Sequence, residues 1–163
     1  MVFAPCSVVT RRPVTFADTA FLRALFAESR EDLMILPADV RDTLVDMQFR
    51  AQRRHYDEAF PLARHDLLVA DGVDVGRLIV ETSAIDVRIV DVVVQNAHRG
   101  RGIASAALAE VIAEADRERR STRLSVWPDN GGARRLYERL GFAVTAATAG
   151  HLEMQRSPTR ERG

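Results

Sequence analysis

Several residue types are scarce or missing in this chain of 163 residues, and each absence excludes a class of protein. Cys6 is the single cysteine, which excludes an intrachain disulfide and a zinc site built from several cysteines. No apolar run approaches the roughly 20 residues that a membrane helix needs. No apolar export segment is recognisable near the N-terminus either. The expected location is therefore the cytoplasm, without a membrane partner.

Net charge is also missing, because 23 basic residues balance 23 acidic ones. Every basic residue is an arginine, which excludes a catalytic lysine. A chain without net charge has no overall field that draws it to nucleic acid, so no nucleic-acid partner is expected and any anion site must be local. His55, His65 and His151 do not cluster with cysteines or acids, and no metal is predicted.

Apolar residues at helical spacing predict two helices behind a short β-branched strand at residues 8–10. Thr15, with Asp18 three residues on, is typical of a helix start. The buried stripe of this first helix is expected to consist of Phe21, Leu22, Leu25 and Phe26. The second helix is expected to begin at Pro37 and to end before Pro61. Its predicted apolar face consists of Val40, Leu44, Met47 and Ala51.

From His65 onward the hydrophobic period changes to two, which indicates strands. A hairpin is predicted around Asp71-Gly72, and the nearly continuous apolar run of residues 85–94 predicts a central strand buried on both faces. Two further helices, at 103–115 and 133–140, alternate with strands expected at 124–126, 142–145 and 152–154. The fold class is therefore α+β, with one domain over residues 1–155 built on a mixed sheet. The tail, residues 156–163, has no large apolar residue and is expected to be disordered.

The segment between the central strand and the next helix carries the strongest chemical signal. There a buried strand leads into a helix through Arg99-Gly100-Arg101-Gly102, and amides at a helix N-terminus lack partners and carry partial positive charge. Gly100 and Gly102 remove side chains that would keep a phosphate away, so a diphosphate is the natural ligand. Two other interpretations stay open. The glycines can merely shape a tight turn, or they can belong to a dinucleotide fingerprint, although Ser105 holds its third glycine position.

A second segment, from Leu124 to Phe142, adds Asn130 as a helix cap and Tyr137 two turns further along the helix. With both segments the chain resembles the GNAT superfamily of N-acetyltransferases, which use acetyl-coenzyme A. The matching residues are Arg99, Gly102 and Ala104 of the motif R-x-x-G-x-A, followed by Asn130, Leu136-Tyr137 and Gly141-Phe142. The resemblance covers residues 87–145, about a third of the chain.

This resemblance implies a mixed, mostly antiparallel twisted sheet of six or seven strands, with two N-terminal helices and two further helices packed on its faces. It also implies acetyl-coenzyme A as the acetyl donor and a small-molecule or peptide amine as the acceptor. In the family the central strand separates from its neighbour, so the backbone of Val92, Val93 and Val94 is expected to pair with the pantetheine arm. Asn130 is expected to contact the cofactor near that separation. The pyrophosphate is expected at the amides of Arg99, Gly100, Arg101, Gly102, Ile103, Ala104 and Ser105.

The resemblance further implies that Tyr137 protonates the leaving thiolate as a general acid, whereas outside the motif such a tyrosine is more typical of core packing. Attack needs a neutral amine, and an alkylamine of pKa about 10.4 is neutral in only roughly 1 of 2,500 molecules at pH 7. Family members often place a carboxylate on the central strand for this purpose. Arg88 occupies that position here. Asp91 is the candidate base, although it can instead anchor a neighbouring loop. Its side chain is expected to face away from Arg88 unless a β-bulge changes the register.

The acceptor is not specified by the sequence, although the first two helices and the loops beside the last strands are expected to select it. Residues 34–36 form an apolar patch that fits a pocket or a dimer contact, so a homodimer is one expectation. A different function also fits both segments, namely a non-catalytic domain that senses acyl-coenzyme A or binds a protein partner. Arg88 favours this alternative, and Tyr137 favours an enzyme.

Overall fold

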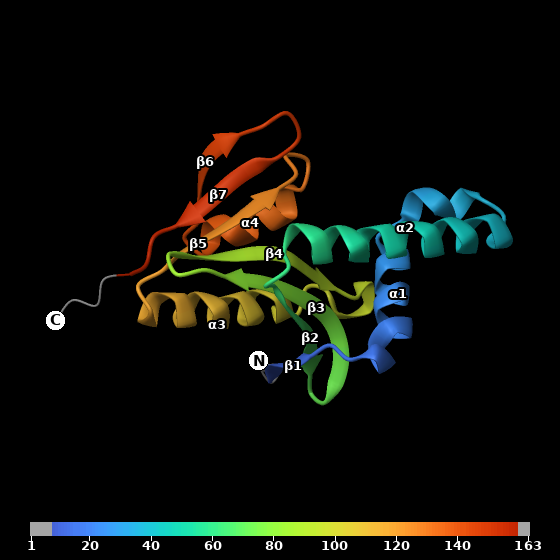
Figure 1. The fold of residues 1–163 in the computed structure, drawn as a ribbon, viewed down its shortest axis with the longest axis horizontal. Coiled ribbons are helices and arrows are strands. Elements are labelled where there is room, and N and C mark those ends of the chain that lie inside the picture. The colour runs from blue at the N-terminus through green and yellow to red at the C-terminus, as the bar shows by residue number, and fades with distance from the viewer. Residues whose placement is uncertain (1–7, 160–163) are drawn as a thin grey trace, which may run out of the picture.

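A computed structural model describes residues 8–159, and within them seven strands form one sheet in the order β1-β2-β3-β4-β5-β7-β6 (Figure 1). All neighbouring strands are antiparallel except β4 and β5, which run parallel. The sheet is therefore mixed and mostly antiparallel, which confirms the expected fold class. The strands are β1 (Val9–Pro13), β2 (Arg64–Ala70), β3 (Val73–Thr82), β4 (Asp86–Val94), β5 (Ser121–Val126), β6 (Ala143–Ala147) and β7 (Leu152–Arg156).

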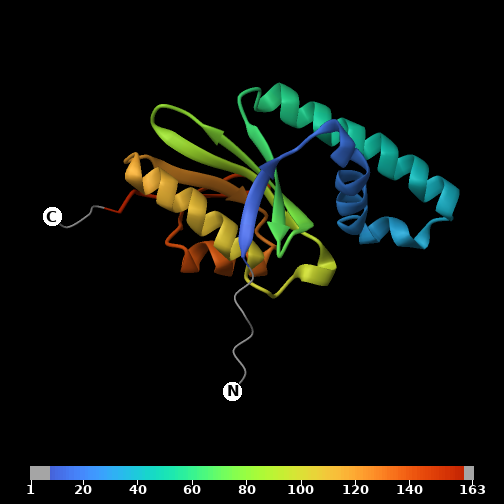
Figure 2. The same cartoon turned by 90° about the horizontal axis from the view of Figure 1, so that it is seen from below.

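Helices cover both faces of the sheet. Figure 1 shows α2 on one side of the strands and α3 on the other, and Figure 2 shows α3 and α4 on the same side. The α-helices of the described residues are α1 (Thr19–Glu28), α2 (Ala38–Ala59), α3 (Ile103–Arg117) and α4 (Gly131–Arg139). Three short 3₁₀ turns, η1 (Phe16–Asp18), η2 (Glu31–Ile35) and η3 (Asn96–His98), join them to their neighbours. The two N-terminal and two further helices thus occupy the layers that the family resemblance implied.

The core is divided by the sheet into a large and a small part. The large part lies against α3 and α4, and its buried members include Leu78, Leu108 and Met154. In α3 the buried positions recur at helical spacing and are Ile103, Ala107, Leu108, Val111, Ile112 and Ala115. The small part joins α1, α2 and β2 through Leu22, Phe49 and Leu67. Both faces of the central strands are therefore packed, as a three-layer arrangement requires.

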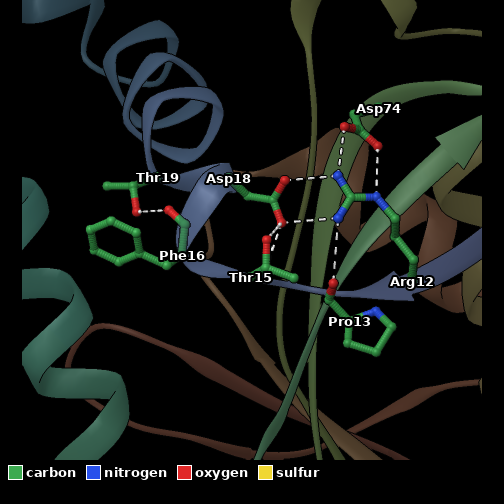
Figure 3. Close-up of polar contacts among 7 residues, drawn as sticks. All are labelled: Arg12, Pro13, Thr15, Phe16, Asp18, Thr19 and Asp74. Atoms are coloured by element: carbon green, nitrogen blue, oxygen red, sulfur yellow. Dashed lines mark hydrogen bonds and ion pairs between the residues drawn. The ribbon is translucent and has the colours of Figure 1, made fainter.

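An ion-pair cluster fixes the start of the first helix to the sheet (Figure 3). Arg12 of β1 donates to both carboxylate oxygens of Asp18 at 2.9 and 2.8 Å, and its Nη2 also contacts Asp74 of β3 at 2.8 Å. The backbone amide of Thr15 donates to Asp18 at 2.7 Å, which completes the predicted capping box. We call Arg12, Thr15, Asp18 and Asp74 the Arg12 clamp. The clamp links β1, β3 and the beginning of the α1–α2 layer.

The predicted apolar face of α2 is wrong. Val45 and Phe49 are buried, whereas Val40 and Met47 are 44% and 58% exposed. The ring of Phe49 packs 5.9 Å from that of Phe26 in α1, so contact with α1 and the sheet selects the buried face. The first half of α2 reaches beyond the strands (Figure 1), and the apolar side chains there have no sheet to pack against.

The expectation of a disordered tail is wrong for residues 156–159. β7 extends to Arg156, which donates to both carboxylate oxygens of Asp116 at 2.7 and 3.0 Å. The amide of Thr159 donates to the same carboxylate at 3.1 Å. A charged anchor to α3 therefore takes the place of the apolar anchor that the sequence lacks. Cys6 and residues 160–163 lie outside the described residues.

Candidate active site

The central strand β4 and its parallel neighbour β5 separate part-way along their length. β4 pairs with β5 only over Asp86–Ile89, whereas further along it pairs with β3 alone. A cleft of about 280 Å³ opens at the separation. The predicted burial of β4 on both faces is wrong for residues 90–93, which all stay partly exposed, and three of them, Val90, Asp91 and Val92, line the cleft. The cleft is lined by Tyr56, Ile89, Val90, Asp91, Val92, Leu124, Ser125, Val126, Trp127, Asn130, Ala133, Tyr137 and His151.

A β-bulge at Val90 decides which side chains β4 presents to each layer. In the register with β3, Asp91 lies opposite Ile79 and Ile89 lies opposite Val80, so Val90 has no partner of its own. Ile89 and Val92 consequently both pack on the α3 side, although residues three apart in a regular strand face opposite ways. The bulge therefore turns Asp91 to the α2 side, the side that Arg88 also faces.

Asp91 lies between an arginine and the two tyrosines of the cleft. Its carboxylate forms an ion pair with Arg77, whose side chain is only 7% exposed and whose guanidinium lies 5.5 Å from the ring centroid of Tyr56. Burial, and next the charge of Asp91, raise the pKa of Tyr56 to about 12. Asp91 is also the only carboxylate among the described residues that line the cleft. The predicted base therefore lies in the cleft, with its charge balanced by Arg77.

Tyr137 belongs to α4 and lines the cleft together with Tyr56 of α2. Its ring packs edge-on against Phe142, with 6.0 Å between the centroids, so the side chain is both a core residue and a cleft residue. Burial first, and the charge of Asp91 second, raise the pKa of Tyr137 to about 12. A phenol with that pKa is protonated throughout the physiological range. Asn130 lines the same wall and caps α4, because its Oδ1 accepts from the amide of Ala133 at 3.1 Å.

Arg99-Gly100-Arg101-Gly102, which we call the glycine turn, leads into the N-terminus of α3, as the sequence predicted. Gly102 is the N-cap and has a φ of +73°, a left-handed conformation that side chains with a Cβ rarely adopt. The first backbone bond of the helix runs from the amide of Ala106 to the carbonyl of Gly102 at 2.9 Å. The amides of Ile103, Ala104 and Ser105 consequently have no acceptor within the helix. Such donors, together with the positive end of the helix dipole, favour a negatively charged group at this position.

Arg99 does not join this set of donors. Its amide donates to the carbonyl of Asn96 at 3.3 Å and its Nε donates to the carbonyl of Val94 at 3.1 Å. The expectation that the Arg99 amide binds pyrophosphate is therefore wrong, because the η3 turn already uses that amide. The carbonyl of Val94 is likewise engaged, so an added ligand would pair with the β4 backbone before Val94. Arg101 contacts His98 at 3.1 Å and Asp71 at 3.7 Å, which holds its side chain beside the turn.

Several cleft residues were missed by the sequence analysis. The rings of Trp127 and His151 lie in contact, with 3.9 Å between their centroids and 40° between their planes. Tyr56 comes from the α2 face that was assigned wrongly. Trp127 follows directly on β5, which is a signal that could have placed it at the separation of the strands. His151 comes from the loop between β6 and β7, and no sequence pattern connects this loop with β4.

Residues 8–159 contain no group of histidines, cysteines and acids able to hold a metal ion. In the same range, none of the helices combines the length and the apolar character that crossing a membrane requires.

Comparison with known proteins agrees with this geometry. No curated protein matches the chain. Among solved structures, the PaiA N-acetyltransferase of Thermoplasma acidophilum in complex with coenzyme A is 14% identical, with a TM-score of 0.70 over 92% of this chain and 99% of that chain. An acetyltransferase from Thermus thermophilus is 22% identical, with a TM-score of 0.65 over 90% and 94%. A GNAT family acetyltransferase from Elizabethkingia anophelis with acetyl-CoA bound is 14% identical, with a TM-score of 0.60 over 91% and 97%. The model of the acetyltransferase (GNAT) family matches residues 33–142, more than half of the sequence, and the chain belongs to this family.

Proposed function

We propose that the chain transfers the acetyl group of acetyl-coenzyme A to a primary amine. The observation that carries this proposal is the separation of β4 from β5 directly in front of an α-helix with unpaired amides. One end of the arrangement fits a diphosphate, and the other end is a cleft lined by a neutral phenol and a carboxylate. A nucleotide thioester fits both ends, because it carries a diphosphate and, at the end of its pantetheine arm, a reactive thioester.

The chain's own residues fit acetyl-coenzyme A in three places. The amides of Ile103, Ala104 and Ser105 would hold the pyrophosphate, because they have no helical acceptor and Gly102 in front of them carries no side chain. The backbone of Val92 and Val93 would pair with the pantetheine arm, since β5 leaves this edge of β4 unpaired. Asn130, which caps α4 and lines the cleft, would lie next to that arm.

Acetyl-coenzyme A supplies a thioester, whose carbonyl carbon is open to attack by an amine and whose sulfur departs as a thiolate. Tyr137 would donate its Oη hydrogen to that sulfur, and its raised pKa of about 12 keeps the hydrogen available. A thiol has a pKa of about 8.5, so a phenol of higher pKa stabilises the thiolate mainly by a hydrogen bond. Tyr137 is therefore proposed as the acid that supports departure of the leaving group.

Asp91 would act on the amine side. A protonated amine is attracted to this carboxylate, which is the only one among the described cleft residues. The nitrogen must lose a proton before it attacks, and Asp91 would accept that proton directly or through a water molecule. Arg77 and Tyr56 would hold the carboxylate in place while it does so.

The alternative function, a non-catalytic sensor of acyl-coenzyme A, predicts binding without turnover. Acetyl-coenzyme A at 100 times its dissociation constant should stabilise the folded chain by about 2.7 kcal/mol under either function. A panel of amines, assayed for release of free thiol, then separates the two. Thiol release that depends on the amine supports the enzyme, whereas a thermal shift without such release supports the sensor. Absence of any thermal shift at saturating cofactor contradicts both.

A further inference from the structure

Arg88 is a charged residue of the α2-side sheet face that the proposed chemistry does not use and that has no ion-pair partner among the described residues. Its neighbours on this face are engaged in ion pairs, Arg77 with Asp91 and Arg123 with Asp86 at 2.7 Å. Among residues 8–159, Arg88 has no carboxylate within ion-pair distance. A guanidinium without a counter-ion in the protein is available to pair with a negative charge that a ligand supplies.

The guanidinium of Arg88 is nevertheless held in a defined place. It lies 5.3 Å from the ring centroid of Phe60, the residue that ends α2. Its Nη2 makes a long contact of 3.4 Å to the hydroxyl of Ser125, a residue that lines the cleft. An arginine has five N–H donors in a planar fork, and this single contact leaves most of them for another acceptor.

The acids closest to Arg88 in the sheet do not neutralise it. Glu81 is its register partner across β3 and β4, but the two side chains form no ion pair. Glu153 of β7 accepts the hydroxyl of Ser125 at 2.5 Å, so its charge reaches Arg88 only through that hydroxyl. The hydroxyl donates to Glu153 and accepts from Arg88, which keeps Arg88 directed to the cleft wall.

We propose that Arg88 binds a carboxylate of the acceptor, so that the acceptor class is an amine that also carries a carboxylate, such as a free amino acid. The inference rests on the proposed acetyl transfer. A planar carboxylate matches the fork of a guanidinium in two parallel hydrogen bonds. Asp91 would then attract the amino group while Arg88 holds the acid group, because the bulge at Val90 turns both side chains to the α2 side of the same strand.

Matched pairs of acceptors test this inference, each pair being an amino acid and its carboxamide. For the intact protein we expect the kcat/KM of the acid to exceed that of the amide at least tenfold. Arg88→Gln should lower the kcat/KM of the acid by about tenfold to a hundredfold, the usual range for hydrogen bonds to a charged group, and leave that of the amide within about twofold. Arg88→Lys should restore part of the preference, since it keeps the charge and loses the fork.

Arg123→Gln is the matched control, because it removes a guanidinium from the next strand that is already paired with Asp86. It should leave the acid preference unchanged. Equal rates for acid and amide, or a preference that survives Arg88→Gln, overturn the inference. Preference for aminoalkyl phosphates over both members of a pair also overturns it.

The failure of the inference is distinguishable from failure of the proposed function. If uncharged amines alone release thiol, acetyl transfer stands and the acceptor class is wrong. If no member of any pair releases thiol while acetyl-coenzyme A still raises the melting temperature, the inference is again overturned and the sensor function is favoured. If acetyl-coenzyme A produces no shift, the proposed function itself fails.

Discussion

Replacement of Tyr137 by phenylalanine tests the proposed chemistry most directly. The substitution removes one hydroxyl and leaves the ring, which is 8% exposed and packs edge-on against Phe142 at 6.0 Å. Folding should therefore change little. Acetyl-coenzyme A should still stabilise the folded variant, because the amides of the α3 N-terminus are untouched.

The expected loss of rate follows from the nature of the missing contact. A hydrogen bond to a charged group contributes about 1.5–3 kcal/mol, and each 1.36 kcal/mol is a factor of ten in rate. Tyr137→Phe should therefore lower kcat by about tenfold to 150-fold. The loss should persist at every pH from about 6 to 10, because the pKa of Tyr137 is raised to about 12 and its hydroxyl does not titrate in that range.

Steady-state thiol release with a saturating acceptor measures this effect. Tyr56→Phe is the comparison variant, because it removes the other phenol that lines the cleft beside Asp91. Its main effect should fall on the KM of the acceptor, with kcat reduced less than in Tyr137→Phe. Unchanged kcat in Tyr137→Phe refutes the acid assignment, and an equal loss in both variants assigns the effect to the surroundings of Asp91.

Three further predictions follow from single contacts. Burial and, second to it, the charge of Asp91 raise the pKa of both tyrosines, and Asp91→Asn removes only the second cause. Ultraviolet titration of the only two tyrosines should therefore show both pKa values falling from about 12 while burial keeps them raised, and kcat should fall as well. Gly76→Ala would place a Cβ 2.3 Å from the carbonyl oxygen of Val93 and should destabilise the fold by about 1–3 kcal/mol in urea unfolding. Gly132→Ala, where the added Cβ meets nothing closer than 4.0 Å, serves as its control. Burial lowers the pKa of His65 from 6.5, so the unfolded chain binds the proton more tightly than the folded chain. The free energy of unfolding should therefore fall as the pH drops below about 6.5. His65→Gln should reduce that dependence on pH.

The helix boundaries and the glycine N-cap of α3 could be predicted because local chemistry determines them. The capping pair Thr15 and Asp18 and the glycine at position 102 act within a few residues of themselves, and the sequence shows them directly. The bulge at Val90 could not be predicted, because it depends on how β3 and β4 fit together. That one residue decides where Asp91 points, so the sequence could name Asp91 as a candidate base but could not place its side chain.

The buried face of α2 also could not be predicted, because it too depends on tertiary contacts. Several apolar residues recur at helical spacing, and propensity alone does not choose between two stripes that overlap. Contact with α1 and the sheet makes the choice, and it buries Phe49 while bringing Tyr56 to the cleft. The ion-pair anchor of Arg156 on Asp116 is likewise tertiary, since α3 and β7 are far apart in the sequence.

The Arg12 clamp connects an edge of the sheet to the helical layer that lies beside the cleft. Hydrogen bonds from Arg12, and next from the Thr15 backbone, hold the pKa of Asp18 well below its usual range, so the clamp stays ionised at pH values where an ordinary aspartate, of pKa about 3.9, is half protonated. The helical layer that it tethers ends in the two aromatic rings beside Asp91 and Arg88. Under the proposed function, loss of the clamp would loosen the helical layer on the acceptor side of the cleft and would leave the amides at the N-terminus of α3 in place.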